Sequence, residues 1–439
     1  MRKLLLGLVL LSLLQACIVV DNGYSVIPPG TWRGVLKLDR PIAQPLRDEA
    51  DLDVRFEEVA KGELPFNFEV EYTDEAKFNI HFLNGEERIT VAAEDITYGR
   101  NRATGKDSIV IKFPVFDSYI SAFYEEDVIE GEWIVNNREN YRIPFVAFHG
   151  KGYRFTELKK DPVMDVSGKW KTTFGIETDE PYVAIGEFEQ EGNQLTGTFR
   201  TETGDYRYLE GTVQADKLYL SVFDGAHAFL FEAKIQEDGK MIGSFRSGSH
   251  YKTLWEAERD EEFELASPDS LTYLTRDDFN FSFPSTAGET VSLADYGDKV
   301  KLVQIFGTWC PNCRDETNFL IDYLEEHPND DLAVVALGFE KYREEEKAMR
   351  ALNRFKDKMN VPYDVLLAGY SNKSEASEAL PMLNRVISYP TLIFVDRNNQ
   401  VRRIHTGFNG PATSEYQDFV EEFDTYLQSL LAESTATES

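Results

Sequence analysis

With 439 residues, the chain is too long for a single hydrophobic core, and two or three domains are expected. Hydrophobic residues make up 42% and charged residues 28%, which is the composition of a folded protein and excludes a largely disordered chain. The formal net charge of −31 leaves no basic surface for a phosphate backbone, so we expect no nucleic acid partner.

The chain opens with a segment typical of protein export. Two basic residues precede an apolar run over 4–14, which is too short to span a bilayer as a permanent helix. The residues Leu-Gln-Ala-Cys at 14–17 resemble the lipobox of bacterial lipoproteins, and this resemblance implies cleavage before Cys17 and acyl chains on that cysteine. We therefore predict a signal peptide over 1–16 and a membrane tether over 17–23. An ordinary secretory signal with an incidental cysteine is the alternative.

Lipid on Cys17 would place the protein in the bacterial cell envelope, facing the periplasm. Ile18 follows this cysteine, where an aspartate would suggest retention at the inner membrane, so we expect the outer membrane. No other long apolar run occurs, and we expect the rest of the chain to form soluble domains.

The chain has three cysteines. If Cys17 carries lipid, only Cys310 and Cys313 remain, and no framework of structural disulfides is available. A disulfide between residues three apart closes almost no loop and would stabilise the fold little. We therefore interpret this pair as a redox couple.

Residues 24–258 have the pattern of β-structure. Strands are expected at 66–72, 108–113 and 217–223, and glycine-containing turns separate such runs. Few segments have the length and period of a helix. The pattern therefore predicts an antiparallel barrel or sandwich.

A weak internal repeat divides this region into β-module 1 over 24–160 and β-module 2 over 161–258. A Gly-x-Trp triplet at 30–32 and 168–170 opens each module, and it resembles the opening of lipocalin-like barrels, which bind small apolar ligands. Core packing is the alternative role of both tryptophans. A second pattern has a glycine two residues before a large aromatic, where close backbone approach is expected. It recurs at 129–133, 195–199 and 241–245, and the tyrosines that follow the three copies are Tyr141, Tyr206 and Tyr251.

A charged linker over 259–274 precedes a region with a different period, and the tail over 432–439 is expected to fray. Between them, strands alternate with helices, which predicts an α/β domain over 275–431 with a partly parallel sheet. The expected strands cover 301–306, 332–337, 391–395 and 401–404, and the expected helices cover 312–326, 343–358, 374–383 and 414–431.

Three stretches of this domain carry a family resemblance. They are an entry segment at 279–284 and 288–293, an active-site stretch at 303–316 containing Trp309-Cys310-Pro311-Asn312-Cys313, and a late stretch at 389–396 followed by Gly407. Together they resemble the TlpA-like branch of the thioredoxin superfamily, periplasmic thiol–disulfide oxidoreductases that are often membrane-tethered. The resemblance implies a thioredoxin-like fold over 275–431.

In this family Cys310 and Cys313 would be the catalytic, redox-active pair. We expect Cys310 at the N-terminus of a helix, where unpaired N–H groups and the helix dipole stabilise a thiolate. Pro311 suits the first helical turn because its missing N–H is not needed there. Cys313 lies three residues on, on the same face, and should be the less exposed thiol that resolves a mixed disulfide.

The resemblance also assigns roles to four residues near the pair. Glu316 would lie close to the cysteines and influence their proton chemistry, although the family commonly has a proline where Asn318 stands, and a helix-surface acid is the alternative. Pro390 would be a cis proline that opens a strand and turns the backbone of Tyr389 toward an extended substrate. Trp309 would cover the disulfide and shape the docking surface, with simple packing as the alternative.

Other uses of the cysteine pair fit less well. A structural zinc site needs a second ligand pair, which the chain lacks, so we expect no metal. Copper delivery would need a wider cysteine spacing and a partner histidine, and the nearest candidate, His405, is expected on a strand surface. A thiol peroxidase would have its threonine three residues before the cysteine, whereas Thr308 lies two before Cys310.

The predicted function is thus a membrane-anchored periplasmic oxidoreductase that reduces protein disulfides. It would take electrons from a membrane-bound thiol donor and need no cofactor. Oxidase and isomerase activity stay open, because thioredoxin-fold potentials run from about −270 to about −120 mV and the sequence gives no value. The alternative function is a ligand- or partner-binding lipoprotein in which the β-modules carry the main role and the thioredoxin-like domain is accessory.

Overall fold

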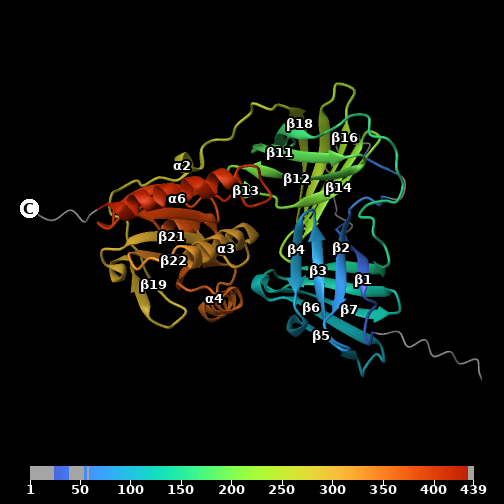
Figure 1. Cartoon of the computed structure of the whole chain (residues 1–439), viewed down its shortest axis with the longest axis horizontal. Coiled ribbons are helices and arrows are strands. Elements are labelled where there is room, and N and C mark those ends of the chain that lie inside the picture. The colour runs from blue at the N-terminus through green and yellow to red at the C-terminus, as the bar shows by residue number, and fades with distance from the viewer. Residues whose placement is uncertain (1–23, 39–53, 57–58, 434–439) are drawn as a thin grey trace, which may run out of the picture.

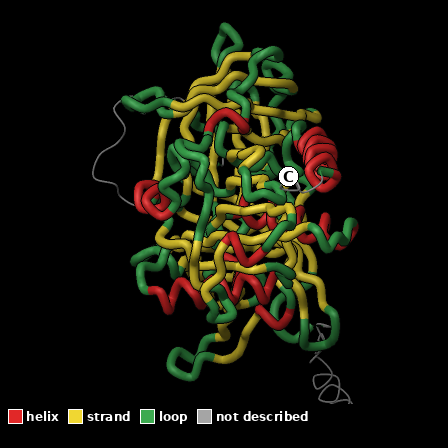
Figure 2. The backbone as a smooth tube through the Cα atoms, turned by 90° about the vertical axis from the view of Figure 1, so that its left-hand side faces the viewer, coloured by secondary structure: helices red, strands yellow, loops and turns green. Residues whose placement is uncertain are grey.

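The computed structural model describes residues 24–38, 54–56 and 59–433, so the predicted signal peptide, the tether and Cys17 lie outside the described residues. The described chain forms two antiparallel sheets of nine strands each, followed by a five-stranded mixed sheet and a two-stranded hairpin with helices (Figures 1 and 2). We call these parts module 1 (β1–β9), module 2 (β10–β18) and the C-terminal domain (α2–α6). A β-rich N-terminal region followed by an α/β domain was the predicted fold class, and it is confirmed.

Module 1 is an open sheet with strand order β4-β3-β2-β1-β9-β8-β7-β6-β5, so that the first strand pairs with both the second and the last. Two short 3-10 helices, η2 (Ala93–Asp95) and η3 (Pro114–Phe116), interrupt the meander. The strands are β1 (Gly30–Lys37), β2 (Glu63–Tyr72), β3 (Phe78–Asn84), β4 (Glu87–Val91), β5 (Ile96–Arg100), β6 (Asp107–Phe113), β7 (Ser118–Glu125), β8 (Val128–Val135) and β9 (Arg142–His149).

Module 2 has the same start, because β10 pairs with both β11 and β18, but here pairing of β11 with β12 closes the sheet into a barrel. The short β13 continues from β12 as a hairpin that leaves the barrel. The strands are β10 (Gly168–Phe174), β11 (Tyr182–Glu191), β12 (Gln194–Thr201), β13 (Gly204–Asp205), β14 (Leu209–Gln214), β15 (Lys217–Phe223), β16 (Ala228–Ile235), β17 (Met241–Ser247) and β18 (Tyr251–Arg259).

The repeated patterns have a common structural basis. Trp32 and Trp170 are fully buried, and each indole N–H donates to the carbonyl four residues earlier, at 3.0 and 2.8 Å. A Cβ on each glycine of the second pattern would overlap a carbonyl oxygen of the neighbouring strand, and the following aromatic contacts the expected tyrosine. The ring pairs are Trp133 with Tyr141, Phe199 with Tyr206 and Phe245 with Tyr251.

Strand β15 joins the two modules. Leu218, Leu220 and Val222 belong to the core of the barrel. Tyr219 and Phe223, which alternate with them, belong to the core of module 1. Every residue of β15 is therefore buried, and the open sheet of module 1 packs on the outside of the barrel.

The C-terminal domain has the sheet order β23-β22-β21-β24-β25, in which β21, β22 and β23 are parallel and β24 runs antiparallel to both of its neighbours, β21 and β25. A short hairpin, β19 (Ser282–Pro284) with β20 (Thr290–Ser292), and the 3-10 helix η4 (Leu293–Tyr296) precede this sheet. The strands are β21 (Val300–Phe306), β22 (Leu332–Glu340), β23 (Asp364–Tyr370), β24 (Thr391–Val395) and β25 (Val401–Thr406), and the helices are α2 (Pro268–Leu271), α3 (Pro311–Glu326), α4 (Glu345–Met359), α5 (Lys373–Ala379) and α6 (Tyr416–Ala432).

Two local expectations differ from the structure. Strand β23 was not predicted, because its apolar run is short, lacks alternation and ends at Gly369. His405 was expected on a strand surface, but it is buried, and its Nδ1 lies 3.1 Å from Asp269 of α2. That prediction was wrong because the predicted linker holds α2, which packs over β25.

No helix in the described part of the chain is both long enough and apolar enough to cross a membrane.

Candidate functional site

The two cysteines lie where β21 meets α3. Cys310 is the N-cap residue of α3 and has extended backbone angles, and Pro311 occupies the first turn. Cys310 Sγ accepts a hydrogen bond from the backbone N–H of Cys313 at 3.2 Å, so the helix N-terminus is directed at this sulfur. Both residues are free thiols, with Cys310 7% exposed and Cys313 fully buried. Cys310 is therefore the thiol that a substrate can reach first.

The late stretch of the sequence meets this pair from the other side. The Tyr389–Pro390 peptide bond is cis, as expected, and the Tyr389 carbonyl oxygen accepts from Cys310 Sγ at 3.3 Å. The rings of Trp309 and Tyr389 meet edge to face at 5.3 Å, and the Trp309 indole donates to the Phe339 carbonyl at 2.9 Å. The structure thus brings Trp309 and the Tyr389–Pro390 peptide, the residues expected to dock substrate, together beside Cys310.

Glu316 lies deeper on the same helix. Its side chain is fully buried, and Oε2 accepts from Gln304 Nε2 at 2.8 Å, whereas Oε1 has no partner within the described ranges. Burial raises the pKa of Glu316 to about 8. Burial, the Cys310 sulfur and Glu316 together raise the pKa of the Cys313 thiol. Glu316 is therefore an internal acid that interacts with Cys313. Helix α3 continues through Asn318 without interruption.

Replacing Glu316 with Gln should change the pH dependence of stability. A carboxyl whose pKa rises from its ordinary value to about 8 on folding contributes stability below its ordinary pKa and loses it as the pH rises through about 8. The free energy of unfolding of Glu316→Gln, relative to that of the unmodified protein, should therefore be larger at pH 8 than at pH 5, because only the unmodified protein loses this contribution. The expected difference exceeds about 1.4 kcal/mol, the value of one pKa unit.

Urea unfolding of the reduced protein at the two pH values measures this difference. Asp322→Asn is the matched control, because Asp322 is exposed on the same helix. An unchanged pH dependence in Glu316→Gln would show that the carboxyl is already ionised at pH 5 in the folded protein.

The structure adds two residues to the site that sequence reasoning missed. Lys341 follows β22, and its ammonium lies 4.0 Å from the centre of the Trp309 ring. Burial lowers the pKa of Lys341, as does Arg138 of module 1, whereas the Cys310 sulfur and Glu340 raise it. Lys341 therefore adds a positive charge to the site, close enough to interact with the Cys310 sulfur.

Glu340 is the second missed residue. It is buried and accepts from the backbone N–H and the hydroxyl of Thr308 at 3.0 and 2.9 Å. Burial raises its pKa to about 7. Its position at the carboxyl end of a parallel strand beside β21 was the available signal, because such ends gather at one edge of a sheet. No three His, Cys, Asp or Glu side chains are grouped to hold a metal ion in the ranges that the structure covers.

Two sequence comparisons agree with this arrangement. The Redoxin family profile matches residues 277–420. The thioredoxin-like protein YneN of Bacillus subtilis (strain 168) is 30% identical over 128 residues, which are 29% of this chain and 68% of that protein. The chain belongs to the thioredoxin superfamily. This member is a thioredoxin-like thiol–disulfide oxidoreductase, with the β-rich modules preceding the thioredoxin-like domain.

About a third of this thioredoxin-like protein is also similar to solved structures. One is a thiol:disulfide interchange protein of the thioredoxin family from Chlorobium tepidum TLS, at 18% identity and a TM-score of 0.28, covering 36% of this chain and 96% of that chain. Another is the thioredoxin domain of a thiol-disulfide oxidoreductase from Bacteroides vulgatus, at 18% identity and a TM-score of 0.27, covering 34% of this chain and 97% of that chain.

Proposed function

We propose that this thioredoxin-like protein reduces disulfides of other proteins through the Cys310–Cys313 pair, at the periplasmic side of a bacterial membrane. The observation that carries the proposal is the placement of Cys310 Sγ. It lies between the N-terminus of α3 and the Tyr389 carbonyl, with Cys313 buried behind it. An extended client segment beside Tyr389 would bring its disulfide to that sulfur.

The reaction would proceed in two exchanges. The Cys310 thiolate attacks one sulfur of the client disulfide, so that a mixed disulfide forms and the other client sulfur leaves as a thiolate. Cys313 loses its proton and attacks Cys310 Sγ, which releases the second client thiol and leaves a Cys310–Cys313 disulfide. Glu316 would take that proton in the fraction of molecules in which it is ionised, because it is the buried carboxyl whose charge interacts with Cys313. A membrane-bound thiol donor would return two electrons and restore the dithiol.

Trapping of clients tests this proposal. In Cys313→Ser the resolving thiol is absent, and a mixed disulfide on Cys310 should persist. Proteins captured from an oxidised envelope fraction are released by reductant and identified by mass spectrometry, with the Cys310→Ser/Cys313→Ser double variant as the control. Recovery of the same proteins from both variants would contradict the proposal.

The proposed anchoring rests on the lipobox resemblance at Cys17. We expect Cys17→Ser to move the protein from the membrane fraction to the soluble fraction and to abolish incorporation of labelled palmitate, because serine has no thiol to carry the lipid and the anchoring acyl chains would be absent. Labelling and fractionation of cells producing each form measure both effects. Cys313→Ser, which keeps the proposed lipid site, should still partition with membranes. Equal partitioning of Cys17→Ser and the unmodified protein would refute lipid anchoring.

A further inference from the structure

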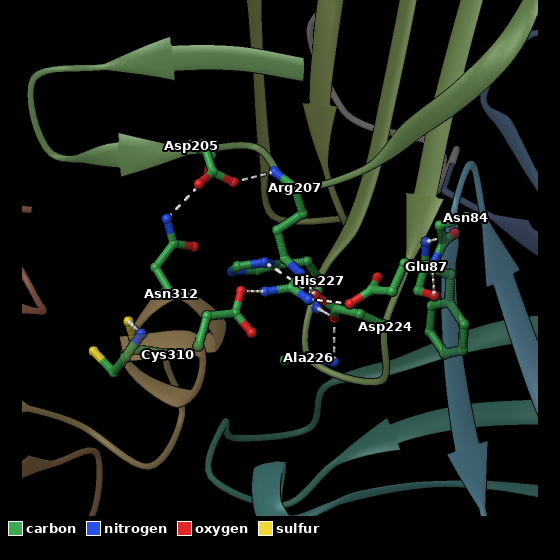
Figure 3. A network of polar contacts seen from close by, with 12 residues as sticks. Asn84, Glu87, Asp205, Arg207, Asp224, Ala226, His227, Cys310 and Asn312 are labelled. Atoms are coloured by element: carbon green, nitrogen blue, oxygen red, sulfur yellow. Dashed lines mark hydrogen bonds and ion pairs between the residues drawn. The ribbon is translucent and has the colours of Figure 1, made fainter. Parts of the chain in front are cut away.

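A hairpin of module 2 lies directly on the redox site. We call residues 200–207, which include β13 and the turn before it, the cap hairpin. Ser388 Oγ donates to the Thr203 carbonyl at 2.8 Å, and Asn312 Nδ2 donates to the Asp205 carbonyl at 3.2 Å. The Asp205 carboxylate in turn accepts from the backbone N–H of Gly410 at 2.6 Å. Figure 3 shows Asn312, close to Cys310, pointing toward Asp205.

The hairpin packs closely against the surface around the cysteines. A Cβ on Gly204 would lie 2.5 Å from Asn312 Nδ2, and a Cβ on Gly407 would lie 2.8 Å from the Thr203 carbonyl carbon. Ser388 immediately precedes Tyr389, so the hairpin covers the strip on which an extended client would pair. Asn312, which the hairpin contacts, is 8% exposed, and Cys310 beside it is 7% exposed.

A buried arginine holds the base of the cap hairpin. The Arg207 side chain is 2% exposed, and its guanidinium contacts Asp315 of α3 and Glu87 of β4. It also lies 3.3 Å from Asp224, in the turn between β15 and β16. Glu87 belongs to module 1, Asp224 to module 2 and Asp315 to the C-terminal domain, so the arginine fixes the hairpin where the three parts meet. Figure 3 shows Arg207 with Glu87 and Asp224.

We propose that the cap hairpin is an internal occupant of the client-docking strip, so that a protein client reaches Cys310 only when the hairpin has moved away. The proposal rests on the function proposed above and adds a selection by substrate size. A small disulfide needs only access to the sulfur. A polypeptide needs the strip beside Ser388 and Tyr389, which the hairpin holds through the hydrogen bonds and close contacts described above.

The test introduces a bulky side chain on the cap hairpin. Gly204→Val adds a side chain that collides with Asn312, whereas Gly239→Val is the matched control, because Gly239 also has positive φ but a Cβ there meets nothing within 4 Å. Pre-reduced full-length protein is mixed with excess insulin or with 5,5′-dithiobis(2-nitrobenzoate), and thiol loss is followed by quenched alkylation and mass spectrometry. A second variant, Asp315→Asn, removes one of the carboxylates that contact Arg207. It replaces Gly204→Val in the test if that variant does not fold.

We expect Gly204→Val and Asp315→Asn to oxidise about tenfold faster with insulin, since a tenfold larger open population corresponds to a shift of only about 1.4 kcal/mol. The rate with the small disulfide should change by less than about threefold, because this substrate does not need the docking strip. Gly239→Val should match the unmodified protein with both substrates.

Unchanged insulin rates in folded variants that still react with the small disulfide would overturn the role of the hairpin. An unmodified protein that reacts with neither substrate would instead refute the proposed function.

Discussion

Cys310→Ser is expected to lose all catalysed disulfide reduction, for insulin and for small disulfides alike. The other cysteine cannot substitute, because Cys313 is fully buried and its pKa is raised by burial and by its neighbours. A serine hydroxyl stays protonated at neutral pH and cannot form a disulfide. Turnover with dithiothreitol as the electron source should therefore fall to the rate measured without protein.

Cys313→Ser should behave differently from Cys310→Ser. It keeps the attacking thiol at the N-terminus of α3, so it should form one adduct per molecule and then stop. Intact-mass measurement after mixing with a small disulfide distinguishes the two variants. Adduct formation on Cys310→Ser at the rate of Cys313→Ser would reverse the assigned roles of the two thiols.

Arg207→Ala should lower the free energy of unfolding by about 3–5 kcal/mol, which is the usual cost of removing one partner from a buried ion pair. Glu87, Asp224 and Asp315 would then face one another without the guanidinium that they share. Burial raises the pKa of Glu87, and the charge of Arg207 acts against that effect, whereas Asp224 and Asp315 add to it. Chemical denaturation at neutral pH measures the loss.

Arg343→Ala is the matched control for the arginine variant. Arg343 pairs with Glu375 at 3.0 Å, but its side chain is 65% exposed, and exposed pairs contribute about 0–1 kcal/mol. Equal losses in the two variants would mean that the three carboxylates around Arg207 find other partners or take up protons without cost.

Local patterns were sufficient to predict most elements of the thioredoxin-like domain. The strand expected at 301–306 and the helix expected at 312–326 match β21 and α3 within one residue at each end. Both have clear signals, a mostly apolar strand and a Cys-Pro start to an amphipathic helix. β23 is as long as β21, but its apolar run covers only 365–368 and does not alternate. Its place in the sheet depends on parallel pairing with β22, which sequence spacing does not reveal.

The candidate site divides in the same way. Cys310, Cys313 and Glu316 follow one another on a single helix, so their spacing alone brings them together. The cap hairpin and its arginine reach the site from more than 100 residues away, by contacts between domains. Arg207 carries no motif, and its three acidic partners come from segments that only the folded structure brings together.

The two faces of β15 have a consequence for how the protein can be divided. One face of β15 completes the barrel interior, and the other completes the core of module 1. Cutting the chain between the modules and separating them would therefore expose an apolar surface on each piece. Residues 24–259 should therefore unfold as one cooperative unit rather than as two. The largely exposed stretch at 260–267 joins this unit to the C-terminal domain. A protease or a truncation can divide the chain there without cutting through a hydrophobic core.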